Sequence, residues 1–269
     1  MAVTITKRPK NGIGEAHDLA TFLNLVDRWS QGIPDLGYSI SLFRGQEDES
    51  WLLKPGIARP QYAKRVKPGT EQRMLSEFKQ RGIPHLESTV ELADADWLAI
   101  AQHHKMPTRL LDWTGSALAA LWFAIKRPAI KGKDGELKAA AVWLLAATDA
   151  DMIQPGEREK PLEITRTKLL KPRHVSRRIA AQDGWFSVHR GVEDNLGMTY
   201  VSLDTNTDFK NRLSFIRIPP DAFGPMRGQL QTAGINRGML FPDLDGVAGR
   251  IADAILYPDD QLTPGAGNI

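Results

Sequence analysis

The chain has 269 residues, of which 42% are hydrophobic and 25% are charged, a composition typical of a globular protein rather than a disordered or fibrous one. The absence of cysteine excludes disulfides and thiolate metal sites, and it is compatible with the cytoplasmic location that we expect. A formal net charge of +3 weakly favours an anionic ligand or partner. No apolar run reaches the roughly 18 to 20 residues that span a membrane, and the first dozen residues lack the apolar core of a signal peptide, so we expect no membrane association.

Apolar spacing and breaker residues predict the elements in chain order. We expect a helix over 15–30, a strand over 38–43, helices over 71–81 and 92–104, a strand or extended turn over 108–114, a helix over 116–126, strands over 140–146, 178–189 and 213–218, a helix over 220–234, and a last helix from Asp243 to about 256. This mixture predicts an α+β fold with a short-stranded sheet and flanking helices. Without internal repeats, the chain is expected to form a single domain over 1–269, with a core of about 38–256, flexible N-terminal residues and a C-terminal tail.

The segment 101–124 places a dense polar cluster directly before a strongly apolar helix. Its hydrogen-bonding side chains are those of Gln102, His103, His104, Thr108, Arg109, Asp112 and Thr114. Polar groups held against a rigid apolar support are typical of clefts, so we interpret this segment as part of a site. The alternative is a buried polar turn that satisfies its own backbone.

Arg44 and Gly45 follow the predicted strand at 38–43, and we expect the strand to deliver them into a turn. An arginine there can hold phosphate in a bidentate fork that lysine does not copy. The glycine would let the backbone turn or let a ligand approach closely. A structural salt bridge from Arg44 to Asp48 or Asp112 is the alternative.

Other polar residues have both functional and structural interpretations. Thr108 and Thr114 offer hydroxyls on either side of Asp112, whereas Ser116 is expected only to cap the following helix. Gln182, on the strand predicted at 178–189, could orient a ribose. His103 and His104 are adjacent on a helix and point about 100° apart, so we expect no metal site, although His103 could hydrogen-bond within the site.

Basic residues gather in two segments that could form solvated faces or contact a phosphate backbone. The first contains Lys54, Arg59, Lys64, Arg65 and Lys67, and the second contains Arg166, Lys168, Lys171, Arg173, His174, Arg177 and Arg178. Lys64, Arg65, Arg173 and Arg177 are the residues predicted to contact nucleic acid.

Five ordered motifs resemble the FRG domain family, which is named for a Phe/Tyr-Arg-Gly motif. They are Phe43-Arg44-Gly45-Gln46, then Trp51-Leu52-Leu53-Lys54-Pro55, then Gln102 through Thr114, then Gln182-Asp183-Gly184-Trp185-Phe186, and finally the stretch 241–246. The resemblance covers most of the chain, from about Ser39 to Ile251. It implies a bacterial or phage setting, often in toxin or anti-phage loci.

The order of elements is also loosely similar to the ADP-ribosyltransferase fold, which implies NAD as substrate. In that case the basic segments would receive a nucleic-acid or acidic protein acceptor. In this similarity Arg44 would hold the pyrophosphate, Thr108 and Thr114 would line the nicotinamide-ribose slot, and Asp112 or Gln182 would steady the ribose. The full predicted set is Arg44, Asp112 and Gln182 for catalysis, and Arg44, Gly45, Gln46, His103, Thr108, Arg109 and Thr114 for NAD. No Glu stands at the position of that fold's catalytic acid, and another acid such as Glu47 or Asp243 could reach in from a loop.

Two further functions are compatible with the sequence. A non-catalytic nucleic-acid-binding module would bind in a salt-dependent manner through the basic segments. A phosphodiester hydrolase using Asp112 and His103 would lack a metal-ligand set. The absence of GxxxxGK[ST], strand-associated GxGxxG and GxSxG motifs disfavours phosphate-loop ATPases, dinucleotide Rossmann folds and α/β-hydrolases.

Overall fold

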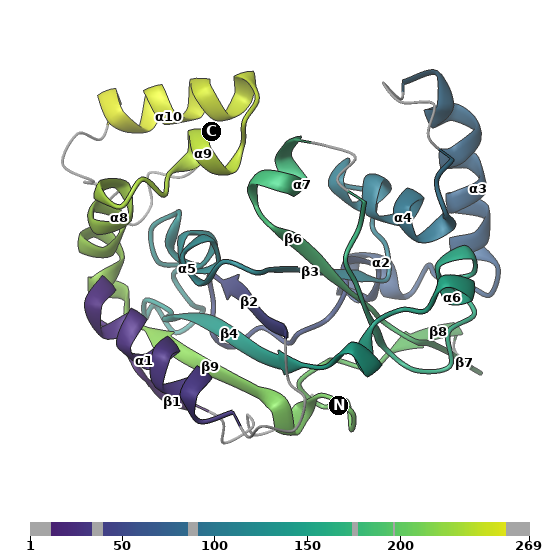
Figure 1. Ribbon diagram of the computed structural model, residues 1–269, viewed down its shortest axis with the longest axis horizontal. Coiled ribbons are helices and arrows are strands. Elements are labelled where there is room, and N and C mark those ends of the chain that lie inside the picture. Colours follow the sequence, from purple (N-terminus) through teal and green to yellow (C-terminus); the bar gives the residue numbers. More distant parts are fainter. Residues whose placement is uncertain (1–11, 34–39, 86–90, 174–176, 196, 257–269) are drawn as a thin grey trace.

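The computed structural model describes residues 12–33, 40–85, 91–173, 177–195 and 197–256, and in these residues helices flank a mixed β-sheet (Figure 1). The helices are α1 (Leu19–Gln31), α2 (Pro60–Ala63), α3 (Thr70–Gly82), α4 (Asp94–His103), α5 (Ala117–Ile125), α6 (Pro155–Glu159), α7 (Arg177–Ala181), α8 (Phe223–Thr232), α9 (Arg237–Leu240) and α10 (Leu244–Leu256). The strands are β1 (Gly12–Glu15), β2 (Ile40–Gln46), β3 (Leu110–Thr114), β4 (Ala140–Ala147), β5 (Lys168–Leu170), β6 (Gly184–Val188), β7 (Gly191–Asp194), β8 (Gly197–Tyr200) and β9 (Leu213–Ile218). The predicted α+β class is confirmed.

Seven strands form the main sheet in the order β1-β9-β4-β2-β3-β6-β5, and β7 pairs with β8 separately. β1 runs parallel to β9, and the other neighbours are antiparallel. Every residue of β4 is buried. A strand covered on both faces needs no polar alternation, which explains why its sequence is one continuous apolar run.

Helices α1, α5 and α8 lie together on one side of the sheet (Figure 1). Their apolar side chains pack with those of β2, β4 and β9 in one core cluster that includes Phe22, Leu121 and Val142. The opposite face buries a second cluster around Leu42 and Trp143. A third cluster joins α3 and α4 to β3, β5 and β6. The central strands are thus held between apolar layers, and their polar side chains are placed on a rigid support.

Several predicted elements are confirmed and one is wrong. The strand at Leu213–Ile218 has the predicted bounds, and Ser116 caps α5 by accepting a 3.2 Å hydrogen bond from the Ala119 amide. The strand predicted over 178–189 is wrong, because helix α7 occupies its first part and only β6 is extended. Between them Asp183 adopts a left-handed backbone with φ of 40°, which makes the turn from helix to strand.

The first motif also differs from its prediction. Residues 38 and 39 lie outside the described residues, and β2 continues through Arg44 and Gly45 to Gln46 instead of ending in a turn. Along its whole length β2 pairs with β4, from Ile40 opposite Ala147 to Gln46 opposite Ala141. Arg44 is therefore fixed within a strand. No helix in the described part of the chain is long and apolar enough to cross a membrane.

Candidate functional site

A pocket of about 1010 Å³ opens where β2 and β3 meet. It is lined by residues of four of the five sequence motifs and by the end of α5. The lining residues are Phe43, Arg44, Gly45, Gln46, Glu47, Ser50, Trp51, Leu52, Lys54, Ala58, Arg59, Pro60, Gln61, Ala63, Asp112, Trp113, Thr114, Phe123, Lys126 and Gln182. Motifs that lie far apart in the sequence thus converge on one concave surface, as expected for a binding site.

The pocket forms because β2 and β3 pair only briefly. The two strands, all of whose residues are described, share one paired position, Phe43 with Thr114. By contrast, β3 pairs with β6 along its full length. Beyond the single pair, the Arg44 side chain bridges the two strands, and its Nη1 donates a 2.6 Å hydrogen bond to the Asp112 carbonyl oxygen. The Arg44 guanidinium group therefore lines the pocket where the two strands meet.

Arg44 carries an unsatisfied donor. Its side chain is 14% exposed, its Nη1 lies 3.7 Å from Asp112 Oδ2, and its buried Nε has no hydrogen-bond partner among the described residues. Burial lowers the pKa of Arg44, the Asp112 carboxylate opposes that shift, and the positive charge of Arg59 adds to it. A buried donor without a partner is uncommon, and this one belongs to a side chain that lines the pocket.

Two carboxylates line the pocket with different surroundings. Asp112 is the exposed position in an otherwise buried strand, and its side chain is 59% exposed. Glu47 is more buried and lies 3.6 Å from the ammonium group of Lys126. Burial lowers the pKa of Lys126, and Glu47 partly offsets that shift. Of the two acids named from the sequence, Glu47 lines the pocket, whereas Asp243 accepts a 2.8 Å hydrogen bond from the Gly246 amide at the start of α10.

Gly45 serves the packing of α5 against β2 rather than a turn. A Cβ atom at this position would lie 2.0 Å from the Ala120 carbonyl oxygen and 2.6 Å from the Ala124 amide nitrogen. Only glycine lets the helix backbone approach the strand this closely. The interpretation of Gly45 as a turn residue is therefore wrong, although it lines the pocket.

Thr114, Gln182 and Gln46 line the pocket while holding neighbouring structure in place. The Thr114 hydroxyl donates to the Gln182 carbonyl at 2.5 Å and accepts from the Ser116 amide at 3.0 Å. Gln182 lies in the turn before β6, contrary to the predicted strand position, and its Nε2 donates to the Leu240 carbonyl at 2.9 Å. The Gln46 Oε1 accepts a 2.8 Å bond from the Trp143 indole.

Three predicted NAD-binding residues lie outside this pocket. The Thr108 hydroxyl is buried and donates to Gln102 Oε1 at 2.8 Å. Arg109 is 2% exposed and forms a buried ion pair with Glu71, to which its Nε donates at 2.9 Å. His103 stacks edge-on against His104 and is not among the pocket-lining residues. Thr108 and Arg109 are engaged within the chain, and none of the three residues lines the pocket.

Residues that the sequence argument did not single out also line the site, namely Trp51, Leu52, Phe123 and Lys126. The Trp-x-Leu-x-Pro motif was the available signal for the first two. Lys126 ends α5, and its ammonium group lies 5.1 Å from the centre of the Phe123 ring. A lysine at the end of an apolar helix has many structural roles, so its sequence position alone did not indicate a pocket.

The first basic segment is exposed beside the pocket. Lys54 and Arg59 line it, whereas Lys64 and Arg65 are exposed immediately beyond Ala63, another lining residue. No ion pair joins any of these four cations to another residue in the described ranges. Their charges are available to an external partner.

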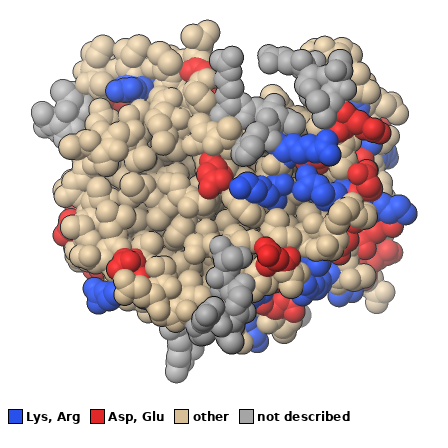
Figure 2. All heavy atoms as spheres, in the orientation of Figure 1, with Lys and Arg blue, Asp and Glu red and all other residues tan. Residues whose placement is uncertain are grey.

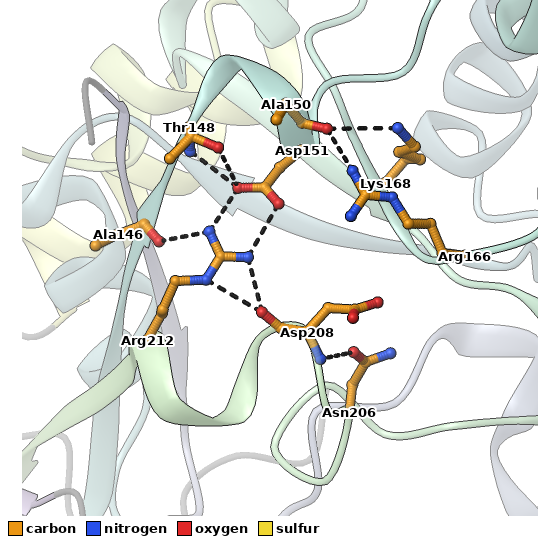
Figure 3. A network of polar contacts seen from close by, with 9 residues as sticks. All are labelled: Ala146, Thr148, Ala150, Asp151, Arg166, Lys168, Asn206, Asp208 and Arg212. Carbon is orange, nitrogen blue, oxygen red and sulfur yellow. Dashed lines mark hydrogen bonds and ion pairs between the residues drawn. The ribbon is translucent and has the colours of Figure 1, made fainter. Parts of the chain in front are cut away.

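The second basic segment is largely occupied by contacts within the chain. Arg166 donates to the Ala150 carbonyl at 2.5 Å, and the buried Lys168 ammonium group lies 3.4 Å from the same oxygen (Figure 3). The neighbouring Arg212 forms a bidentate pair with Asp151, at 2.6 and 2.9 Å (Figure 3). These donors hold the end of β4 against β5 and β9.

Arg173 is also committed to internal contacts, whereas the side chain of Arg177 lies outside the described residues. Arg173 donates to the Glu91 carbonyl at 2.7 Å, and its Nε lies 3.7 Å from the buried Asp96 carboxylate. Figure 2 shows that Lys and Arg are interspersed with Asp and Glu on the side of α4 and α6. The nucleic-acid contact predicted for Arg173 is therefore less well supported than those for Lys64 and Arg65.

No group of His, Asp or Glu side chains in the described ranges is arranged to hold a metal ion. The pocket lining itself offers guanidinium and ammonium groups, two carboxylates and aromatic rings. Such a set suits an anionic ligand with flat rings.

Comparison with known proteins finds one similarity, and it covers most of the pocket-lining residues. Residues 39–133 match the FRG domain. The match includes the motifs at 43–46, 51–55 and 102–114, whereas Gln182 and the 241–246 motif lie beyond it. No curated protein and no solved structure matches the chain. The walls formed by β2, β3 and the segment between them thus lie within the residues that match the FRG domain.

Proposed function

We propose that the pocket binds NAD and that the protein transfers ADP-ribose from NAD to an acceptor, or to water. The observation that carries this proposal is Arg44, a largely buried guanidinium with an unpartnered Nε at the floor of a large pocket. A pyrophosphate would bind the part of the Arg44 guanidinium that lines the pocket and would be attracted by Lys54 and Arg59 on the same walls. The pocket volume, about 1010 Å³, suits a ligand of dinucleotide size.

The two carboxylates would support the chemistry at the ribose. In such a transfer the bond from ribose C1′ to the nicotinamide nitrogen breaks, and nicotinamide leaves with the bonding electron pair. The acceptor forms a new bond to C1′ and loses a proton. Positive charge develops at the ribose on the way, and a nearby carboxylate stabilises it. Asp112 is exposed to the pocket for this role, and Glu47 is the second candidate.

A matched pair of arginine variants tests the proposal. Arg44→Ala is expected to weaken NAD binding at least tenfold in calorimetry, because a charge-assisted contact to phosphate is lost. Arg44→Lys is expected to restore little, since an ammonium does not copy the guanidinium geometry. The control is Arg81→Ala, whose side chain is 82% exposed on α3 away from the pocket lining.

The reaction itself is measured with radiolabelled NAD and separate protein, DNA and RNA acceptors. Label transfer by the wild type that Arg44→Ala abolishes would support a transferase and identify its acceptor class. Nicotinamide release without transfer would indicate a NAD glycohydrolase. Unchanged NAD binding in Arg44→Ala, or no NAD binding by the wild type, would overturn the proposal.

The exposed first basic segment favours a second candidate, a non-catalytic nucleic-acid-binding module. This function requires no NAD and no role for Asp112. It would be favoured if nucleic-acid binding remained salt-dependent in a protein that neither binds nor cleaves NAD.

A further inference from the structure

One wall of the pocket, formed by residues 51–65, presents aromatic rings to solvent. This wall, called here the 51–65 wall, contains Trp51, whose surface is 48% exposed, and Tyr62, which is 38% exposed. Trp51 lines the pocket, and Tyr62 lies on α2 between the lining residues Gln61 and Ala63. Large aromatic rings exposed beside a pocket indicate a binding surface more than a packing role.

The wall is anchored from behind by alternate buried residues. Leu53, Pro55 and Ile57 point into the protein and are buried. The Leu53 carbonyl accepts a 3.0 Å bond from the Leu203 amide, and the Ile57 amide donates to the Thr108 carbonyl at 3.1 Å. These contacts fix the backbone, so the outward side chains are held in a preorganised arrangement.

Positive charges accompany the aromatic rings along the same wall. They belong to Lys54, Arg59, Lys64 and Arg65, which form no ion pair with other described residues. Arg59 lies close enough to the pocket floor that its charge lowers the pKa of Arg44. Unpaired cations interleaved with exposed rings are the features that bind a single nucleic-acid strand, with rings for the bases and cations for the phosphates.

We propose that the 51–65 wall binds single-stranded nucleic acid and stacks an unpaired base on Trp51 at the mouth of the pocket. A duplex would offer phosphates to the cations but would keep its base faces stacked inside the helix. An acidic peptide would likewise leave the exposed rings unused. The observations therefore favour a single strand over either alternative partner.

This inference rests on the proposed function only for the transfer step, in which the strand would be the acceptor. A nitrogen of the presented base would form the bond to ribose C1′ as nicotinamide departs with its electron pair, and the base would release a proton. Binding of the strand itself requires no NAD. It is therefore measured separately.

The test uses the full-length protein and a fluorescently labelled 12-nucleotide strand, as DNA and as RNA, with the matching duplex as competitor. We expect the single strand to bind at least tenfold more tightly than the duplex. Trp51→Ala is expected to weaken single-strand binding about fivefold or more, and Trp51→Phe to restore most of it, because stacking requires a ring rather than an indole. Lys133→Gln, an exposed charge removal outside the pocket lining, is expected to change neither affinity by more than twofold.

Each outcome bears on the proposal. Equal affinities for strand and duplex, tighter binding of a polyglutamate peptide, or full affinity in a folded Trp51→Ala variant would overturn it. Arg44→Ala separates this inference from the proposed function, since that variant should lose NAD binding and still bind the single-stranded nucleic acid. If wild-type protein binds the strand but not NAD, the proposed function fails and the inference about the wall stands.

Discussion

The two arginines associated with β3 lie in opposite environments. Arg109 precedes the strand in a closed cluster where Glu71 occupies its donors, and the Tyr200 hydroxyl donates to the same carboxylate at 2.6 Å. Arg44 reaches the middle of the strand from β2, at Asp112, and lines an open pocket. Both lie within the residues that match the FRG domain, yet only Arg44 lines the pocket. The comparison shows that a motif residue can hold the fold as readily as it can form the site.

The largest effect that separates the two arginines is expected in stability. Arg109→Met would leave the Glu71 carboxylate buried without its partner, and breaking such a pair costs about 3–5 kcal/mol of unfolding free energy. Arg44→Met removes one bond to a carbonyl and should cost about 1 kcal/mol or less. Urea unfolding measures both variants. Equal losses would contradict the distinction between a structural and a binding arginine.

A pH-dependent change of about 3 kcal/mol in unfolding free energy is expected from His189, which lies beside Arg109 at the start of β3. Burial lowers the pKa of His189 from 6.5 to about 4. Its ring lies between the Ser187 hydroxyl and the Val201 carbonyl, and its amide donates to the Arg109 carbonyl. The folded protein therefore keeps the ring neutral between pH 6.5 and 4, whereas the unfolded chain takes up a proton.

Stability from His189 is thus fully present above pH 6.5 and is lost as the pH falls towards 4, by up to about 1.4 kcal/mol per pH unit. Urea unfolding across this range, compared with His189→Asn, isolates the contribution. The variant should show a shallower decline with falling pH. Parallel declines in the two proteins would mean that His189 is not kept neutral by the fold.

A smaller effect on unfolding free energy is expected at Thr114, which ends β3 and lines the pocket. Thr114→Val removes the hydroxyl that bonds the Gln182 carbonyl and the Ser116 amide, and the expected cost is about 1–2 kcal/mol. Because this hydroxyl is occupied, NAD affinity should fall less than in Arg44→Ala. Unfolding and calorimetry on one preparation check both points. A loss of affinity as large as that of Arg44→Ala would instead make Thr114 a ligand contact.

The elements that the sequence predicted well are those with strong apolar patterns. Three elements have apolar patterns that are long or regular enough to predict them from the sequence alone. They are the run at Ala140–Ala147, the apolar helix α5 and the strand Leu213–Ile218. β1 and β5 have only four and three residues and are set by pairing with distant strands. The segment 178–189 looked uniformly extended, and the left-handed turn at Asp183 that divides it depends on backbone geometry that composition does not reveal.

The candidate site was predictable from the sequence only in part. Arg44, Asp112 and Gln182 were expected together, and all three line the pocket. The sequence did not reveal that Arg109 is paired with Glu71, because that partner is 38 residues away. Likewise, Gly45 was interpreted through turn chemistry, whereas the close approach of α5 requires it. Motif spacing predicts which residues lie close together. Whether a side-chain donor is already paired depends on contacts with residues far away in the sequence.

The smallest effects are expected where the same distinction applies to the two basic segments. Arg65→Gln removes an exposed charge, so unfolding free energy should change by no more than about 0.5 kcal/mol, while the salt dependence of single-strand binding should fall by about 0.7 in log–log slope. Arg173→Gln should leave that slope unchanged and lower stability instead, because its donors are engaged with Glu91 and Asp96. Anisotropy titrations at several salt concentrations and urea unfolding measure the two quantities. If Arg173→Gln reduced the salt slope as much as Arg65→Gln, contacts within the chain would not distinguish structural from binding cations in this protein. The distinction between the paired Arg109 and the pocket-lining Arg44 would then not extend to the basic segments.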